Sequence, residues 1–246
     1  MSNAVIYDKL KFLKLSHFAK SLEANFQTYK NQDYDFYEIL NLLLDVEINQ
    51  RHNNRIQNLL KSAKLRYSDA RLEEIDYSAS RQLKRSDISH LFDCEWINNK
   101  QCLIITGMTG TGKTWMGCAF ANHACRLEIK TIYVSASQLY EELHMSILDG
   151  SIAKVKQKYM KPNLLVIDDF GLGGIDSSLC PALLDIIDKQ STVGGLLITS
   201  QFPTEKWHGF FEDATIADAI LDRIVHRSHL IELKGESLRK NRTAKK

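Results

Sequence analysis

Apolar residues in the first sixty positions recur three or four residues apart. The first such set is Phe12, Leu15, Ala19, Leu22 and Phe26. This spacing places apolar side chains along one side of a helix. We therefore expect one helix over residues 10–26 and a second over residues 36–60, the second with an apolar first half and a polar, basic second half.

Beyond residue 100 the pattern changes to short apolar runs separated by longer stretches of helical character. The runs cover residues 102–106, 131–134, 164–167, 196–199 and 229–233. Short runs rich in β-branched residues that alternate with helices are typical of a parallel sheet covered on both faces. The pattern predicts an α/β domain with five strands.

The two patterns are separated by residues 65–100, where the periodicity fades and Ser, Asp and Arg become frequent. This composition is typical of a connector. We place the domain boundary near residues 65–85, with a helical domain over 1–75 and a nucleotide domain over 76–246 that ends in a short basic tail. A chain of 246 residues has room for both.

Charge is unevenly distributed, although the formal net charge is only +2. Residues 51–85 carry nine Lys and Arg against four acids, and the last thirteen residues carry six against one. Arg51 and Arg55 would share one helix face, and a lysine run follows later at Lys154, Lys156, Lys158 and Lys161. Each group is a candidate for contact with an anionic partner such as DNA, or a solvated surface.

The five cysteines form no Cys-x-x-Cys pair and have no histidine at metal-binding spacing. Reduced, buried thiols of a cytoplasmic protein are the simplest interpretation. No signal-peptide pattern opens the chain, and no apolar run approaches the roughly 18 residues that a membrane span requires.

The first strand leads directly into the pattern G-x-x-x-x-G-K-[ST]. Its members are Gly107, Met108, Thr109, Gly110, Thr111, Gly112, Lys113 and Thr114. In such a loop the glycines let backbone N–H groups surround the phosphates, the lysine reaches the β- and γ-phosphates, and the last hydroxyl binds Mg²⁺. An incidental glycine turn is the alternative, but the strand before and the expected helix over 115–127 favour an ATP or GTP site.

Two acids, Asp168 and Asp169, follow the strand at 164–167. We expect Asp168 to hold Mg²⁺, largely through water, and Asp169 to polarise the attacking water. Asp also favours turns, yet a separation of 55 residues from Lys113 is normal for the two halves of a nucleotide site.

The strand at 196–199 also ends in polar residues, Ser200 and Gln201. Some phosphate-loop ATPases insert this strand between the first and third strands, so that its end lies beside the γ-phosphate. One of the two residues would then orient the water and sense hydrolysis, with Gln201 as our catalytic candidate.

An amphipathic helix before the last strand carries Arg223 and Arg227 one turn apart. Arg223 is a candidate to contact the γ-phosphate of a neighbouring subunit. The alternative is an ion pair within the chain, for which Asp218, Asp222 and Glu232 are near in sequence.

Together these motifs resemble the IstB-type transposition helper ATPases, relatives of the DnaC helicase loader within the AAA+ superfamily. The resemblance covers about residues 10–240. It is carried by the phosphate loop and by the segments at 43–55, 166–171, 198–203 with Trp207, 217–225 and 232–237.

The resemblance implies an α/β AAA+ core with a five-stranded parallel sheet in the order 5-1-4-3-2 and a small N-terminal helical domain. It further implies ATP and Mg²⁺ as ligands and a homo-oligomer on double-stranded DNA. DNA-stimulated ATP hydrolysis would occur at subunit interfaces, with Arg223 as the interface arginine. The assembly would recruit a partner transposase of the same insertion element.

Two features depart from the AAA+ pattern. Asp169 stands where most AAA+ proteins have the longer Glu, which is compatible with slow hydrolysis. The sequence after Arg239 has no room for a helical lid, so Arg239 would be the local candidate for a sensor arginine.

Three other functions share some of these features. A DnaC-type helicase loader has the same core, although a zinc module is disfavoured because no Cys precedes Cys94. A small-molecule kinase would need an arginine-rich lid and an acceptor site, which the sequence lacks. A non-catalytic DNA-binding scaffold with structural ATP is the last alternative.

Overall fold

The computed structural model describes residues 3–32, 34–77 and 82–237, and the chain forms two compact units, residues 1–58 and 59–246. The units divide within helix α3 (Phe36–Ala63), earlier than the domain boundary expected near residues 65–85. The reason is that Ala70, Leu72 and Ile75 are buried in the core of the second unit.

The first unit contains α1 (Asn3–Phe12), α2 (Ser16–Asn31) and the first part of α3. The single helix expected over residues 10–26 is wrong, because the chain turns between α1 and α2. Lys14 adopts a left-handed conformation, with φ of 57°, and the Leu15 N–H donates to the Leu10 carbonyl at 2.8 Å. This turn ends α1 in the way a left-handed residue commonly ends a helix, although the apolar spacing continues through it.

The amino end of α2 is capped by a carboxylate from α3. The backbone N–H groups of His17 and Phe18 donate to Glu47 Oε2 at 2.9 and 3.0 Å. Arg51 Nε donates to the other oxygen of Glu47 at 2.8 Å, and Arg51 Nη2 donates to the Lys14 carbonyl at 2.8 Å. The Arg51 guanidinium therefore serves the packing of the first unit.

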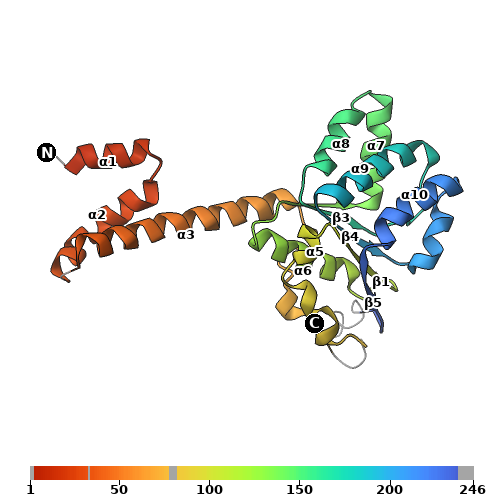
Figure 1. Ribbon diagram of the computed structural model, residues 1–246, viewed down its shortest axis with the longest axis horizontal. Coiled ribbons are helices and arrows are strands. Elements are labelled where there is room, and N and C mark those ends of the chain that lie inside the picture. The colour runs from red at the N-terminus through yellow and green to blue at the C-terminus, as the bar shows by residue number, and fades with distance from the viewer. Residues whose placement is uncertain (1–2, 33, 78–81, 238–246) are drawn as a thin grey trace, which may run out of the picture. The chain divides into compact units, whose positions relative to one another are not determined.

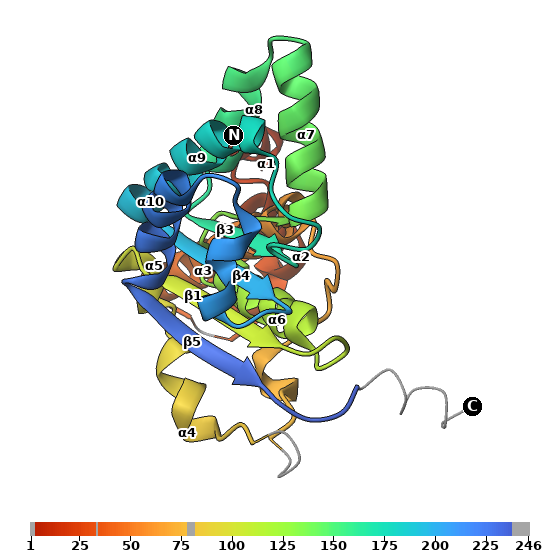
Figure 2. The same ribbon diagram turned by 90° about the vertical axis from the view of Figure 1, so that its right-hand side faces the viewer.

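The second unit is built on a five-stranded parallel sheet in the order β2-β3-β4-β1-β5, with β5 at one edge (Figures 1 and 2). This confirms the expected order 5-1-4-3-2. The strands are β1 (Cys102–Gly107), β2 (Thr131–Ser135), β3 (Leu164–Asp168), β4 (Gly195–Ser200) and β5 (Ser228–Leu233).

Helices cover both faces of the sheet (Figure 1). On one face lie α7 (Ala136–Leu148), α8 (Ile152–Met160), α9 (Cys180–Val193) and α10 (Ala214–Val225). On the other face lie α5 (Glu95–Asn98) and α6 (Lys113–Arg126). Successive β1 side chains point into opposite layers, Ile104 into the first and Leu103 and Ile105 into the second.

The segment expected to be a connector, residues 65–100, is largely part of the α6 layer. Its described residues form η1 (Leu72–Glu74), α4 (Arg85–Ile88), η3 (Ser89–Leu91) and α5. Trp96 and Ile97 are buried beside the sheet. Helices of three or four residues are too short to show a periodic pattern, which is why the sequence suggested a linker. Two further short helices, η4 (Ser177–Leu179) and η5 (Thr204–Phe210), lie in the loops after β3 and β4.

Candidate nucleotide-binding site

The phosphate loop connects the carboxyl end of β1 to the first turn of α6, as expected. Gly107, Gly110 and Gly112 have φ of 148°, 85° and 96°, which residues with a side chain rarely adopt. A Cβ on Gly107 would lie 2.4 Å from the Leu233 carbonyl oxygen of β5. The loop thus requires glycine both for its conformation and for its contact with the neighbouring strand.

Lys113 is the first residue of α6, and its ammonium group folds back over the loop. Its Nζ donates to the Met108 carbonyl at 2.9 Å, and the Thr111 hydroxyl donates to the same oxygen at 2.8 Å. The residue is only 5% exposed. A buried ammonium at a helix amino end, inside a loop of glycine N–H groups, fits the binding of phosphate groups.

Above the loop is a cleft of about 140 Å³. Its lining combines phosphate-loop residues with two residues from neighbouring strand ends and three that the sequence analysis did not single out. The lining residues are Arg66, Tyr67, Thr109, Gly110, Gly112, Lys113, Thr114, Trp115, Asp169 and Gln201. The structure therefore brings the phosphate loop, Asp169 and Gln201 together.

Asp168 ends β3 and is fully buried, with each carboxylate oxygen hydrogen-bonded. Oδ1 accepts from the Thr199 hydroxyl at 2.6 Å, and Oδ2 accepts from the Tyr133 hydroxyl at 2.7 Å. Burial and the nearby Asp168 charge raise the pKa of Tyr133, so its hydroxyl remains a donor. The two hydroxyls hold the carboxylate in one orientation.

Asp169 follows in a left-handed conformation, with φ of 57°, and its side chain lines the cleft. Asp tolerates this conformation better than most residues. Its N–H donates to the Thr199 hydroxyl at 2.9 Å. A single hydroxyl of β4 therefore positions both acids, and the sequence analysis missed both Thr199 and Tyr133, because only strand pairing brings them to Asp168.

Of the two residues considered at the end of β4, Ser200 and Gln201, only Gln201 lines the cleft. Its Oε1 accepts a hydrogen bond of 2.7 Å from the Thr109 hydroxyl of the phosphate loop. Ser200 is fully buried, and its hydroxyl donates to the Phe170 carbonyl at 2.9 Å.

The described residues fit a metal ion that is held jointly with a nucleotide. They contain no group of three or more His, Cys, Asp or Glu side chains that could hold an ion alone. Thr114 lines the cleft, whereas Asp168 is fully buried and is not among the lining residues, so Asp168 would hold the ion largely through water. Mg²⁺ typically combines one or two protein oxygen ligands with water and substrate phosphates.

Arg223 does not line the cleft of its own chain. Its Nε bonds to Asp188 of α9 at 2.5 Å, and its Nη1 donates to the Ala219 carbonyl at 2.8 Å. Cys102, at the amino end of β1, donates a hydrogen bond of 3.8 Å from its Sγ to the Arg223 carbonyl oxygen. The phosphate loop starts at the opposite end, at Gly107, which is about 16 Å away at the usual rise per residue.

The intrachain ion pair of Arg223 thus exists, but its partner is Asp188 rather than the three acids suggested by the sequence. Arg227 is exposed, and its carbonyl accepts the N–H of Cys102 at 3.0 Å. Arg239 lies outside the described residues.

Comparisons with known proteins agree with this fold and with an ATP-binding protein. Residues 8–246 match the model of the family described as IstB-like ATP binding protein. The chain is 34% identical over 238 residues to an insertion sequence ATP-binding protein of Sinorhizobium fredii, covering 97% of each chain. It is 35% identical over 196 residues to the IS1162 ATP-binding protein of Pseudomonas fluorescens, covering 80% of this chain and 85% of that one. Among solved structures, DnaI superposes with a TM-score of 0.59 at 20% identity, covering 74% of this chain and 92% of DnaI.

Proposed function

Because the chain belongs to the IstB-like ATP-binding protein family, we propose that it is the ATPase that assembles on double-stranded DNA and recruits the transposase of its insertion element. Family membership and the AAA+ fold make it an ATP-binding ATPase. The observation that carries the rest is the 34% identity to an insertion sequence ATP-binding protein along 97% of both chains. At 97% coverage of this chain, that likeness extends into the helical unit as well as the nucleotide unit.

In the proposed nucleotide site, the phosphate loop and Lys113 hold the phosphates of ATP, and Thr114 and Asp168 hold Mg²⁺. The ion supplies positive charge that offsets the charge of the phosphates. Asp169 lines the cleft and polarises the attacking water. Gln201, already bonded to the loop, orients that water.

Arg223 is proposed to act on the nucleotide of a neighbouring subunit. Its backbone lies at the amino end of β1, so it cannot reach the phosphate loop of its own chain. If it contributes to hydrolysis, it must do so across an interface, which requires the homo-oligomer. Its pairing with Asp188 is partly exposed and can be exchanged for a phosphate at little cost.

DNA is proposed to be held through its phosphates. Arg51 is a weaker candidate than its sequence suggests, because its guanidinium is bonded to Glu47 and to the Lys14 carbonyl. In the lysine run, Lys156 pairs with Asp185 and Lys158 with Glu142, at 2.8 and 2.6 Å.

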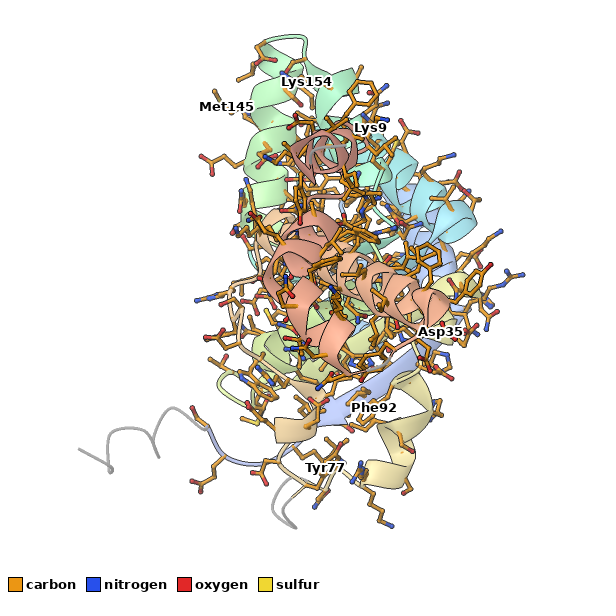
Figure 3. The ribbon with its side chains drawn as sticks, turned by 90° about the vertical axis from the view of Figure 1, so that its left-hand side faces the viewer. Lys9, Asp35, Tyr77, Phe92, Met145 and Lys154 are labelled. Atoms are coloured by element: carbon orange, nitrogen blue, oxygen red, sulfur yellow. The ribbon has the colours of Figure 1, made fainter. Side chains whose placement is uncertain are left out.

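Lys154 and Lys161 are exposed, and neither forms an ion pair with the described residues. Figure 3 shows Lys154 with Met145 at one end of the second unit, away from Tyr77 and Phe92. These two lysines are the better placed pair for phosphates. No described helix is long and apolar enough to cross a membrane, and the proposed place of action is the cytoplasm.

The test is phosphate release by the purified chain with ATP and Mg²⁺, with and without duplex DNA. Stimulation by duplex DNA, together with retention of the co-expressed transposase by the ATP-bound chain, would support the proposal. If ATP turnover is the same with and without duplex DNA, and the chain does not bind the duplex, the chain is an ATPase that does not act on DNA. ATP binding without any turnover would favour the scaffold alternative.

A further inference from the structure

Residues 66–68 follow the end of α3 and pack against α6, where they contact two buried side chains, Asn122 and Cys118. The Asn122 amide donates to the Ser68 carbonyl at 2.6 Å. The Cys118 sulfur lies next to the backbone N–H groups of Arg66 and Tyr67. Cys118 is fully buried and Asn122 is 3% exposed. The position of this segment is therefore set by the interior of the second unit rather than by surface contacts.

The orientation of the Asn122 amide is fixed as well. Arg126 Nε donates to Asn122 Oδ1 at 2.8 Å, which leaves the amide nitrogen to face Ser68. Thr114, Cys118 and Asn122 are spaced by four residues, so they lie on one side of α6 in successive turns. The segment follows that side of the helix, with the Arg66 backbone beside Cys118, one turn after Thr114.

The Arg66 guanidinium stands at the rim of the cleft, beside the group that orients Asp168. The residue is exposed and lines the cleft with Thr114 and Asp169. Its side chain interacts with the Tyr133 hydroxyl, which donates to Asp168 Oδ2 at 2.7 Å. No described carboxylate forms a direct ion pair with Arg66, so its fork of N–H donors is open to an anion in the cleft.

This position indicates which part of a nucleotide Arg66 would meet. Thr114 and Asp168 are the proposed Mg²⁺ ligands, and in ATPases that ion bridges the β- and γ-phosphates. The Arg66 guanidinium is separated from Asp168 by the Tyr133 hydroxyl alone, which would place it near the terminal phosphate of a bound nucleotide. Arginine binds phosphate through two parallel hydrogen bonds, which a lysine cannot reproduce.

We propose that Arg66 binds the terminal phosphate of ATP within its own subunit and so makes the site prefer ATP over ADP. This inference rests on the nucleotide site proposed above. Arg66 follows the last residue of α3 by three positions, so the same contact places the end of that helix next to the nucleotide. Asn122 is then a positioning residue, which acts through Arg66.

The test compares the affinity for ADP with that for a non-hydrolysable ATP analogue, both with Mg²⁺, by titration calorimetry on the full chain. We expect Arg66→Ala to weaken binding of the analogue about tenfold or more, as for a lost charge-assisted hydrogen bond, and to change ADP binding less than about threefold. Arg66→Lys should recover only part of the loss. Arg71→Ala is the matched control, because Arg71 is exposed, precedes η1 and does not line the cleft.

A second variant tests the positioning of Arg66. Asn122→Ala should reduce the preference for the ATP analogue in the same direction, and the double variant with Arg66→Ala should be no worse than Arg66→Ala alone. Additive losses would overturn the positioning role of Asn122.

Equal losses for both nucleotides, or no loss, in folded Arg66→Ala would overturn the proposal while leaving the ATPase assignment intact. Failure of the parental chain to bind either nucleotide would instead overturn the proposed site itself.

Discussion

Lys113 is the residue on which we expect nucleotide binding to depend most directly. Its ammonium group is nearly buried and faces the phosphate loop. We expect Lys113→Ala to abolish ATP binding or turnover and to leave the far-ultraviolet circular dichroism spectrum unchanged, since the loop conformation is set by its glycines. Calorimetric titration with ATP measures the loss. Hydrolysis at the parental rate would show that the phosphate-loop assignment is wrong.

Asp169 allows binding and chemistry to be separated. Its side chain lines the cleft, whereas its backbone N–H holds the Thr199 hydroxyl. Asp169→Asn keeps the size and the backbone contact but removes the carboxylate that polarises water, so ATP should bind while turnover falls more than tenfold. Steady-state phosphate release with a parallel ATP titration checks both parts. A smaller fall would exclude Asp169 from this role.

At the scale of elements, the first unit depends on the Glu47 cap of α2. Burial opposes the charge of Glu47, but hydrogen bonds from Phe18, Arg51 and His17 prevail and lower its pKa below the ordinary 4.5. A carboxylate with a lowered pKa stabilises the fold above its unfolded-state value. That contribution is lost as the pH falls through the lower, folded-state value.

Glu47→Gln should therefore destabilise the first unit by about 1 kcal/mol at neutral pH, because the charged cap at a helix amino end is lost. It should also flatten the loss of helix content on acidification below pH 4.5. Circular dichroism and proteolysis within residues 1–58 measure both effects. Glu23→Gln, an exposed acid on α2, is the control and should behave as the parent. Equal behaviour of the two variants would contradict the capping role.

Helix α8 and Lys161, which follows it, offer a matched test of DNA contact. Each phosphate contact removed lowers the steepness of log K against log salt by about 0.9. Replacing Lys154 and Lys161 together by Ala should flatten the slope by about 1.8 for unrelated duplexes alike, because phosphates carry no base identity.

The matched control for that double variant replaces Lys156 and Lys158, whose charges are paired within the chain. This change should leave the slope nearly unaltered. Equal slopes for all forms would exclude Lys154 and Lys161 as DNA contacts, and Arg55→Ala would then test the basic half of α3.

At the scale of the whole molecule, Arg223 tests whether subunits share active sites. Arg223→Ala should leave ATP affinity nearly unchanged but slow DNA-stimulated turnover. Asp188→Asn breaks the same ion pair and keeps the arginine, so it should retain turnover. Equal losses of turnover in both variants would show that Arg223 only stabilises the packing of α9 on α10 through its ion pair with Asp188.

Mixing Arg223→Ala with Lys113→Ala subunits completes that test. An interface in the mixture can pair an intact phosphate loop with an intact arginine, so partial recovery of turnover is expected. No recovery between variants that co-assemble would count against action across the interface.

Local sequence determined the phosphate loop and the strands, because both are set by short stretches of chain. The glycine spacing specifies the loop, and each apolar run becomes a strand within about one residue of its expected limits. Lys113 and Thr114 follow from the same local pattern. The strand order came from the resemblance to a family and not from the pattern itself.

Only the tertiary structure decided which side chains meet across elements. Tyr133 and Thr199 reach Asp168 through the pairing of β2 and β4 with β3, and Asp188 reaches Arg223 through the packing of α9 on α10. Arg51 was assigned to a solvated or DNA-binding face because one of its two partners, the Lys14 carbonyl, is 37 residues away. Periodicity records which face of an element is apolar, but hydrogen bonds between distant residues depend on how the chain folds back on itself.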